Sequence, residues 1–209
     1  DTSAVFAGPV PVYIDHPPAD KKDAAAPIAA LATGTRDVAP DSLPERLQPA
    51  LNWLRAGTVA YKKVDSLLPG HPFAETAWIA QHGHFNLTVF APAFPAQGRI
   101  TVDDRQWIVR PDGTREGVAT PLIEAFSSLS RRACSSFAND GVCDTWIPEI
   151  LNDTDLDRVV ATVENSAAAN PLWCGSAGLA HALARRWQLA PDLGSAALLP
   201  GGEGPTVLI

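Results

Sequence analysis

Short apolar runs, too brief for helices, alternate along this chain with longer segments whose apolar residues recur at helical spacing. This alternation is typical of βα units, in which parallel strands form a sheet and helices cover its faces. We therefore predict an α/β fold, a three-layer sandwich around a mostly parallel sheet. The predicted strands are residues 11–15, 27–32, 58–64, 87–91 and 172–174.

The segments between these strands carry helix signals. Ser42 and Glu45 have the spacing of a capping box, so a helix is expected to begin there. It should end at Gly57, and Pro49 within it predicts a kink or a late start. Residues 99–109 alternate apolar and polar, which predicts a small β-hairpin beside the main sheet. The other predicted helices are 71–82, 153–168 and 179–187.

The net charge limits the classes of partner. Lys and Arg number 16 and Asp and Glu 23, which gives a net charge of −7 at pH 7. This balance disfavours nucleic acids and anionic membranes, because both are bound through broad basic surfaces. It does not exclude a small anion held by a few local donors. No run reaches the roughly 18 apolar residues of a membrane span and no leader pattern is seen, so we expect a soluble, cytoplasmic protein.

The cysteines and histidines lack metal-binding spacing. Cys134, Cys143 and Cys174 form neither a CxxC pattern nor the Cys/His pattern of zinc sites. Because their number is odd they cannot all pair, and we expect reduced, mostly buried thiols. His82 and His84 lie two residues apart at the end of a predicted helix, where the helix dipole favours cations. We therefore expect no metal site.

The first candidate site follows the predicted strand 58–64. Lys62, Lys63, Asp65 and Ser66 lie at its C-terminal end. Ligands of open α/β sheets bind at such ends. A cation, a carboxylate and a hydroxyl there suit a substrate that is both anionic and hydroxylated. The alternative is a half-buried strand edge whose lysine stems pack along apolar surface.

A second candidate site follows the predicted strand 87–91. Two prolines keep residues 92–97 extended, and Gly98 permits a backbone conformation or a close approach that a side chain would block. Arg99 then projects from a stiff loop, and its planar guanidinium suits bidentate binding of a carboxylate or phosphate. The alternative is a rigid crossover in which Arg99 binds backbone carbonyls.

A third candidate is the run of small residues 174–180 between a strand and a helix. Gly175 and Ser176 would present N–H groups and a hydroxyl at a helix N-terminus, which is a common anion site. The same run could equally be a tight packing point, and it matches neither glycine motif for phosphates. No nucleophile elbow, HExxH or Cys–His arrangement occurs in the sequence, so hydrolase activity has no support.

Taken in order, these segments resemble the N-terminal domain of the four-carbon acid sugar kinase family, the bacterial threonate, erythronate and 3-oxo-tetronate kinases. Asp1 and Thr2 resemble the close of the family's opening motif. Two departures are Pro69, where the family usually has Arg, and residues 111–147, which match poorly. Pro69 removes a cation from the expected anion pocket. The matching segments are YKKVDSLLPGH, APAFPAQGRIT, DTDLDRVV and PLWCGSAGLAHALA.

The resemblance implies an enzyme that transfers the γ-phosphoryl group of ATP to the terminal hydroxyl of a four-carbon sugar acid. Residues 1–190 would bind the acid, and residues 191–209 would form a linker and first strand toward an ATP-binding domain beyond Ile209. ATP and Mg²⁺ would be held mainly in that domain, so this chain alone is expected to be inactive. Sheet edges left open would favour a homo-oligomer.

The same resemblance implies roles for individual residues. Lys63 and Arg99 would hold the carboxylate of the acid or the transferred phosphate. Asp65 or Asp1 would orient the attacking hydroxyl, although the two are not distinguished. The remaining substrate-binding residues would be Lys62, Ser66, Gly98, Gly175 and Ser176.

Two other functions are left open. Pro69 and the missing ATP-binding half also fit a non-catalytic acid-binding domain or a degenerate homologue. Residues 174–180 would alternatively serve a nucleotide-binding enzyme of the Rossmann type.

Overall fold

The computed structural model describes residues 5, 10–17, 28–118, 120–129, 131–137, 143–166, 170–189 and 206–208. Asp1 and most of the predicted linker 191–209 lie outside these residues. None of the helices described is long and apolar enough to cross a lipid bilayer.

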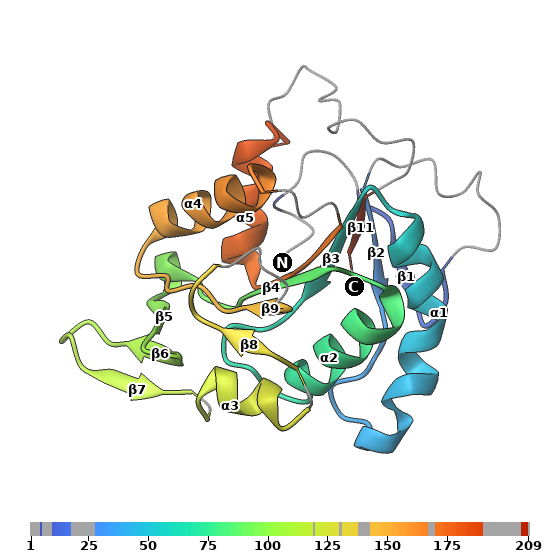
Figure 1. Ribbon diagram of the computed structural model, residues 1–209, viewed down its shortest axis with the longest axis horizontal. Helices are drawn as coiled ribbons and strands as arrows, with labels where there is room; N and C mark the ends of the chain where they lie inside the picture. The colour runs from blue at the N-terminus through green and yellow to red at the C-terminus, as the bar shows by residue number, and fades with distance from the viewer. Residues whose placement is uncertain are drawn as a thin grey trace.

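An eight-stranded sheet forms the centre of the molecule (Figure 1). All pairings between its strands are parallel, which confirms the predicted sheet. The last strand in the chain, β11, lies between β2 and β3. In spatial order the strands are β1 (Val12–Ile14), β2 (Ile28–Ala32), β11 (Thr206–Leu208), β3 (Val59–Lys63), β10 (Pro171–Gly175), β4 (Leu87–Ala91), β9 (Thr145–Trp146) and β8 (Ala133–Cys134).

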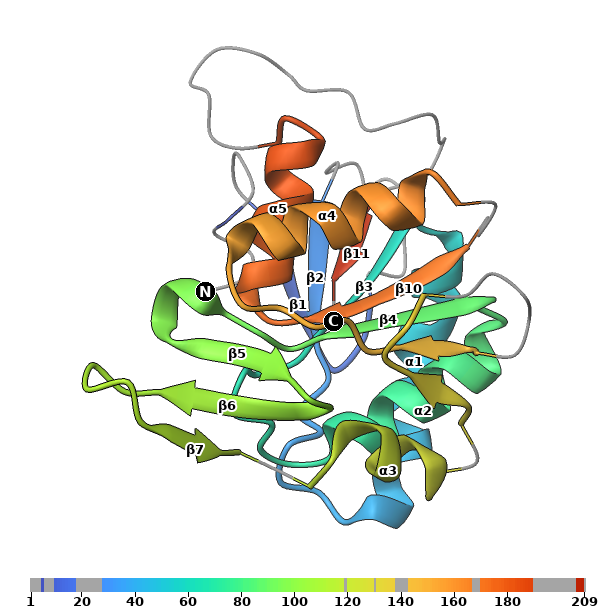
Figure 2. The ribbon, with the colours of Figure 1, turned by 60° about the vertical axis from the view of Figure 1, so that its left-hand side comes forward.

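Helices cover both faces of the sheet and complete the predicted three-layer sandwich (Figures 1 and 2). Two helices, α4 and α5, pack together over one face, and the other three lie over the opposite face. The helices are α1 (Leu43–Ala56), α2 (Pro72–Gly83), α3 (Leu122–Ser127), α4 (Asp153–Glu164) and α5 (Ala177–Arg186).

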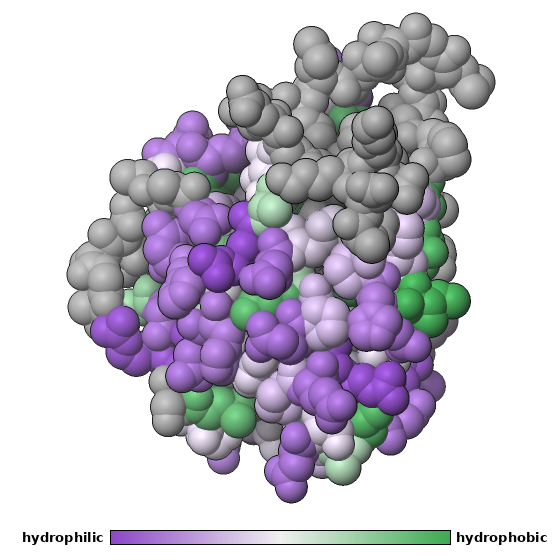
Figure 3. All heavy atoms as spheres, turned by 90° about the vertical axis from the view of Figure 1, so that its right-hand side faces the viewer, coloured by the Kyte–Doolittle hydropathy of each residue, from purple (hydrophilic) through white to green (hydrophobic). Residues whose placement is uncertain are grey.

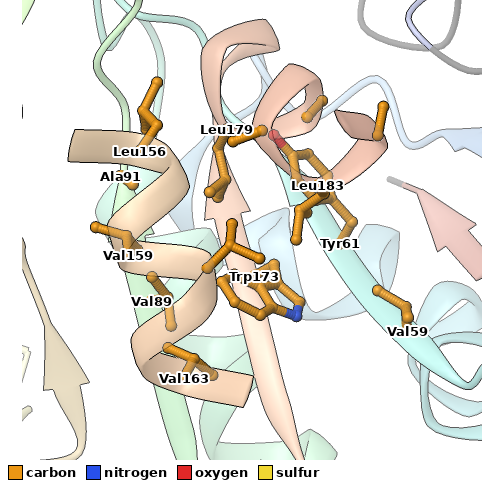
Figure 4. Packing of buried hydrophobic residues seen from close by; sticks show 14 of the residues in the cluster. Val59, Tyr61, Val89, Ala91, Leu156, Val159, Val163, Trp173, Leu179 and Leu183 are labelled. Carbon is orange, nitrogen blue, oxygen red and sulfur yellow. The ribbon is translucent and has the colours of Figure 1, made fainter. Parts of the chain in front are cut away.

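Alternate residues of β3 pack into two different cores. Tyr61 joins the core beneath α4 and α5, together with Trp173 and Leu183 (Figure 4). Ala60 joins the core beneath α1 and α2. Because both faces are covered, residues 59–61 of the strand form a continuous apolar run. The Tyr61 hydroxyl also donates a 2.6 Å hydrogen bond to the carbonyl of Ser176, which joins β3 to the start of α5.

The side of the molecule that carries α1 and the edge strand β1 is mostly hydrophilic, with separate apolar places (Figure 3). Val12 and Ile14 of β1 are 55% and 76% exposed. Among the described residues, no broad apolar face is seen from this side (Figure 3). In a parallel sheet, ligands bind at the carboxyl ends of the strands, so the candidate site residues are expected there rather than on the side that carries α1 and β1.

A second, three-stranded antiparallel sheet contains the predicted hairpin and one further strand. Its turn, Asp103 and Asp104, has positive φ angles of 51° and 57°. Asp104 Oδ1 accepts a 2.7 Å hydrogen bond from Ile123 N at the start of α3, and Thr101 forms a β-bridge with Ile150. The small sheet is thus joined to the main body. Its strands are β5 (Arg99–Val102), β6 (Arg105–Val109) and β7 (Arg115–Gly117).

The predicted capping box of α1 is wrong. Ser42 makes no side-chain capping hydrogen bond, and α1 runs from Leu43 through Pro49 without a late start. A 3-10 turn, Pro40–Ser42, leads into α1, so the Ser42 backbone already has helical angles (φ −90°, ψ −6°). An N-cap side chain needs extended backbone to reach back to the helix.

The cysteine prediction is wrong for two of the three residues. Cys134 and Cys143 form a disulfide with a Cα–Cα distance of 6.1 Å. Strands β8 and β9 lie side by side, which brings the two ends of their connecting loop together. Cys174 is a buried free thiol, as predicted, and burial raises its pKa to about 12.

Candidate functional site

A pocket of about 290 Å³ lies where the carboxyl ends of β3 and β10 meet the loop after β4 and the start of β5. All three candidate segments of the sequence contribute to it. The pocket is lined by Lys63, Val64, Asp65, Ser66, Leu67, Phe94, Gln97, Arg99, Ser176 and Ala177.

Asp65 supplies the carboxylate of the pocket. Its Oδ1 accepts a 2.9 Å hydrogen bond from Leu67 N, which fixes the turn after β3. Its Oδ2 lies 3.8 Å from Lys63 Nζ and 3.8 Å from Arg36 Nη2, and the side chain is 37% exposed. Both distances exceed that of a hydrogen bond. Oδ2 is therefore placed to accept a hydrogen bond from a hydroxyl group.

Arg36 is a cation of this region that the sequence reasoning missed. It follows β2, and its side chain is 57% exposed beside Asp65. The backbone of Gly70, with φ +75°, packs against it so closely that a Cβ at position 70 would lie 2.9 Å from the Arg36 carbonyl. His71 Nε2 is 2.9 Å from the carbonyl oxygen of Val38. The loop after β2 is thus held against the turn after β3. The available signal was an arginine directly after a predicted parallel strand.

Arg99 lines the pocket from the small sheet. Its Nη1 donates to the backbone carbonyl and to Oε1 of Gln97, at 2.9 and 2.7 Å, and both acceptors are neutral. Its Nε is buried and has no hydrogen-bond partner in the part of the chain that the structure describes. A guanidinium in a pocket whose acceptors are neutral keeps its positive charge available to an anionic ligand.

Gly98 is required by the backbone beside Arg99. Its φ is +70°, and a Cβ there would lie 2.7 Å from the carbonyl oxygen of Val109. Both the left-handed conformation and the close approach exclude a larger residue. Gly98 therefore orients Arg99 rather than lining the pocket itself.

Gly175 and Ser176 show tight packing at the start of α5. A Cβ at position 175 would lie 2.6 Å from the Cβ of Leu179. Ser176 Oγ donates to the carbonyl of Ala93 at 2.7 Å and accepts from Gly178 N at 3.1 Å, so it caps α5. Its only proton is used within the protein. Ser176 can thus accept a further hydrogen bond but not donate one without breaking this contact.

Lys62 does not line the pocket. Its Nζ lies 2.5 Å from Glu75 Oε2 in a pair whose side chains are both 7% exposed. It also donates to the carbonyl of Lys63 at 3.2 Å. Neighbouring residues of a strand point to opposite faces, so only one of the two lysines reaches the pocket. Asp1 lies outside the described residues.

The two histidines singled out in the sequence lie at the end of α2, away from these residues. His82 Nδ1 is 2.8 Å from the carbonyl oxygen of Trp78, and His84 has a positive φ of 57°. Across the described ranges, no group of three or more His, Cys, Asp or Glu side chains could hold a metal ion.

Residues 9–125 match the sugar-binding N-terminal domain family. The chain belongs to this family. It is also 30% identical to a D-threonate kinase of Cupriavidus necator, over 94% of this chain and 52% of that protein. The resemblance expected from the sequence is thereby confirmed.

Solved structures of the DUF1537 family share this fold. A domain from Bordetella bronchiseptica, solved with bound citrate as a domain-swapped dimer, superposes with a TM-score of 0.65 at 22% identity, over 88% of this chain and 51% of that chain. A Haemophilus influenzae protein gives a TM-score of 0.66 at 14% identity, over 88% and 51%. The chain described here therefore spans about half the length of these relatives.

Proposed function

We propose that this chain is the acid-binding part of an ATP-dependent kinase that phosphorylates the terminal hydroxyl of a four-carbon sugar acid, such as threonate, erythronate or a 3-oxo-tetronate. One observation carries the proposal: Lys63, Asp65 and Arg99 line one pocket at the carboxyl edge of the sheet. The 30% identity to a D-threonate kinase supports the substrate class.

The charges of the pocket fit a hydroxy acid. Arg99 and Lys63, the two cations that line the pocket, bind the carboxylate or the incoming phosphoryl group. Asp65 Oδ2 accepts the hydrogen bond of the attacking hydroxyl, and Arg36 adds positive charge beside it. Phosphoryl transfer depends mainly on such positioning and on neutralising charge. Citrate bound to the Bordetella relative is also a hydroxy acid, which agrees with this ligand class.

ATP and Mg²⁺ are supplied, in this proposal, by a second domain beyond residue 209, because the matched D-threonate kinase is about twice as long as this chain. Residues 1–190 form the acid-binding domain and 191–209 lead toward the second domain. Lys63 and Arg99 fit the phosphoryl group of ATP, because both are cationic and line the same pocket. Mg²⁺ is bound through the phosphates of ATP, as is usual for this ion.

A non-catalytic acid-binding protein is the second candidate, since Pro69 removes a cation from the turn after Asp65. Both candidates require the acid to bind in the pocket. They differ only in turnover, so one set of measurements separates them.

The test compares this chain alone with the chain joined to its proposed ATP-binding domain. ATP consumption is screened with Mg²⁺ against D- and L-threonate, D-erythronate and 3-oxo-tetronates, and acid binding is measured by calorimetry. Turnover of one acid by the longer protein alone supports the kinase. Acid binding without turnover in either supports the second candidate. Absence of acid binding in both contradicts the proposed function.

A further inference from the structure

The pocket has two walls from different sheets, and the side chain of Gln106 joins them. Gln106 lies on β6 and is fully buried, with 0% of its surface exposed. Its Nε2 donates a 3.0 Å hydrogen bond to the carbonyl of Ser66, in the turn after β3. Its Oε1 accepts a 2.7 Å hydrogen bond from Thr101 Oγ1, on β5.

The orientation of this amide is fixed by its partners. The Ser66 carbonyl can only accept, so the amide nitrogen must face it, and the Thr101 hydroxyl then donates to the amide oxygen. Buried polar groups left without a partner are costly. An isosteric hydrocarbon or carboxylate at position 106 would leave the Ser66 carbonyl without its donor.

The two partners of Gln106 lie beside groups of the pocket. Ser66 belongs to the turn in which Leu67 N and Leu68 N donate to the carboxylate and carbonyl of Asp65, each at 2.9 Å. Thr101 follows Arg99 by two residues on the same strand. It is also paired with Ile150 through two backbone hydrogen bonds of 2.9 and 2.8 Å. Gln106 thus connects the turn that carries Asp65 with the strand that carries Arg99.

We propose that Gln106 is a positioning residue that sets the separation of Asp65 from Arg99. It does not line the pocket itself, so it acts through its bond to Ser66 and through the backbone pairing of Gln106 with Thr101 between β6 and β5, rather than by touching the ligand. The inference rests on the proposed function only in so far as Asp65 and Arg99 contact the acid. The connection between the two walls is independent of the ligand.

The test uses Gln106→Leu, with Thr101→Val as the matched control. Thr101→Val removes one hydrogen bond of the same amide but keeps the bond to Ser66. Amide hydrogen exchange at Leu67 and Leu68 is measured in the full chain without ligand. We expect exchange there to be about tenfold faster in Gln106→Leu and within about twofold of wild type in Thr101→Val. Gln106→Asn, whose shorter side chain cannot reach both partners, replaces the leucine variant if that variant does not fold.

Acid binding gives the second measurement. We expect Gln106→Leu to weaken binding of the acid at least about tenfold and Thr101→Val to weaken it less than about threefold. Equal exchange rates at Leu67 and Leu68 in the two variants would overturn the inference. So would unchanged acid binding in Gln106→Leu. If the wild-type protein binds none of the acids, the proposed function fails, and the exchange rates still decide the role of Gln106.

Discussion

Lys62 and Lys63 are neighbours in β3, but their ammonium groups lie on opposite faces of the sheet. Lys62 is buried against Glu75 of α2, whereas Lys63 lies in the pocket, 3.8 Å from Asp65. The same residue type therefore has two different tasks. One lysine is paired with a carboxylate in the interior, and the other lines the pocket.

Replacing each lysine by alanine should separate these tasks. Lys62→Ala leaves the Glu75 carboxylate buried without its partner, which is expected to cost about 3–5 kcal/mol of unfolding free energy. Lys63→Ala removes a partly exposed cation and should change that free energy by less than about 1 kcal/mol while weakening acid binding. Urea unfolding and calorimetry on both variants check this. A stable Lys62→Ala protein would contradict the buried pair.

In the chain joined to its proposed ATP-binding domain, Arg99→Ala should reduce kcat/KM for the acid at least about tenfold, which corresponds to ~1.4 kcal/mol. Arg99→Lys should not restore it, because an ammonium lacks the planar, bidentate donors of a guanidinium. Steady-state kinetics with the acid and with ATP varied in turn give the measurement. The loss of kcat/KM should appear when the acid is the varied substrate. Wild-type kcat/KM in Arg99→Ala would remove this residue from the site.

Arg36→Ala should weaken acid binding about fivefold, because Arg36 adds positive charge beside Asp65 without lining the pocket. Arg46→Ala is the matched control. Arg46 is also half-exposed and lies 3.4 Å from an aspartate, Asp15, but away from the pocket. Calorimetry with both variants, repeated at high salt, is the measurement. The effect of Arg36→Ala should shrink as salt screens the charge. Equal affinities of the two variants would show that Arg36 has no part in binding.

The thiols should show two distinct behaviours. In denaturant without reductant, one thiol should react with Ellman's reagent, and three should react after reduction, because Cys134 and Cys143 are bonded. In the folded protein at pH 8, Cys174 should not react. Burial raises its pKa to about 12, so the reactive thiolate is scarce, and the buried sulfur is also out of reach. Three reactive thiols without reductant would contradict the disulfide.

The sequence was sufficient to predict the sheet and the edge at which the pocket lies. Each of the five predicted strands has a counterpart. Lys63, Asp65, Ser66 and Ser176 come together because they lie at or just after the carboxyl ends of parallel strands, and the loop after β4 brings Arg99 to the same place. Alternation along a strand predicts that Lys62 and Lys63 point to opposite faces, but not which of the two reaches the pocket. Both faces of β3 are covered, so its apolar residues do not alternate with polar ones. The pattern therefore does not show which face of the sheet a given residue occupies.

Other features depended on contacts between distant segments. Gln106 and Ser66 are 40 residues apart, and nothing in either local pattern predicts that they meet. Cys134 and Cys143 are bonded because of how β8 and β9 pair, which the number of cysteines cannot reveal. Arg36 was accessible to the same argument that found Lys63, since it also follows a parallel strand.

The place of β11 has a consequence for how the protein is made. β2 and β3 are not paired with one another, because the strand formed by residues 206–208 lies between them. Parallel strands are about 4.8 Å apart, so during synthesis β2 and β3 must stay separated by a gap about one strand wide until residues 206–208 pair with both. The sheet can be completed only after residue 208 has left the ribosome. A nascent chain that stopped earlier would keep two facing strand edges with unpaired backbone groups, which can pair with another chain.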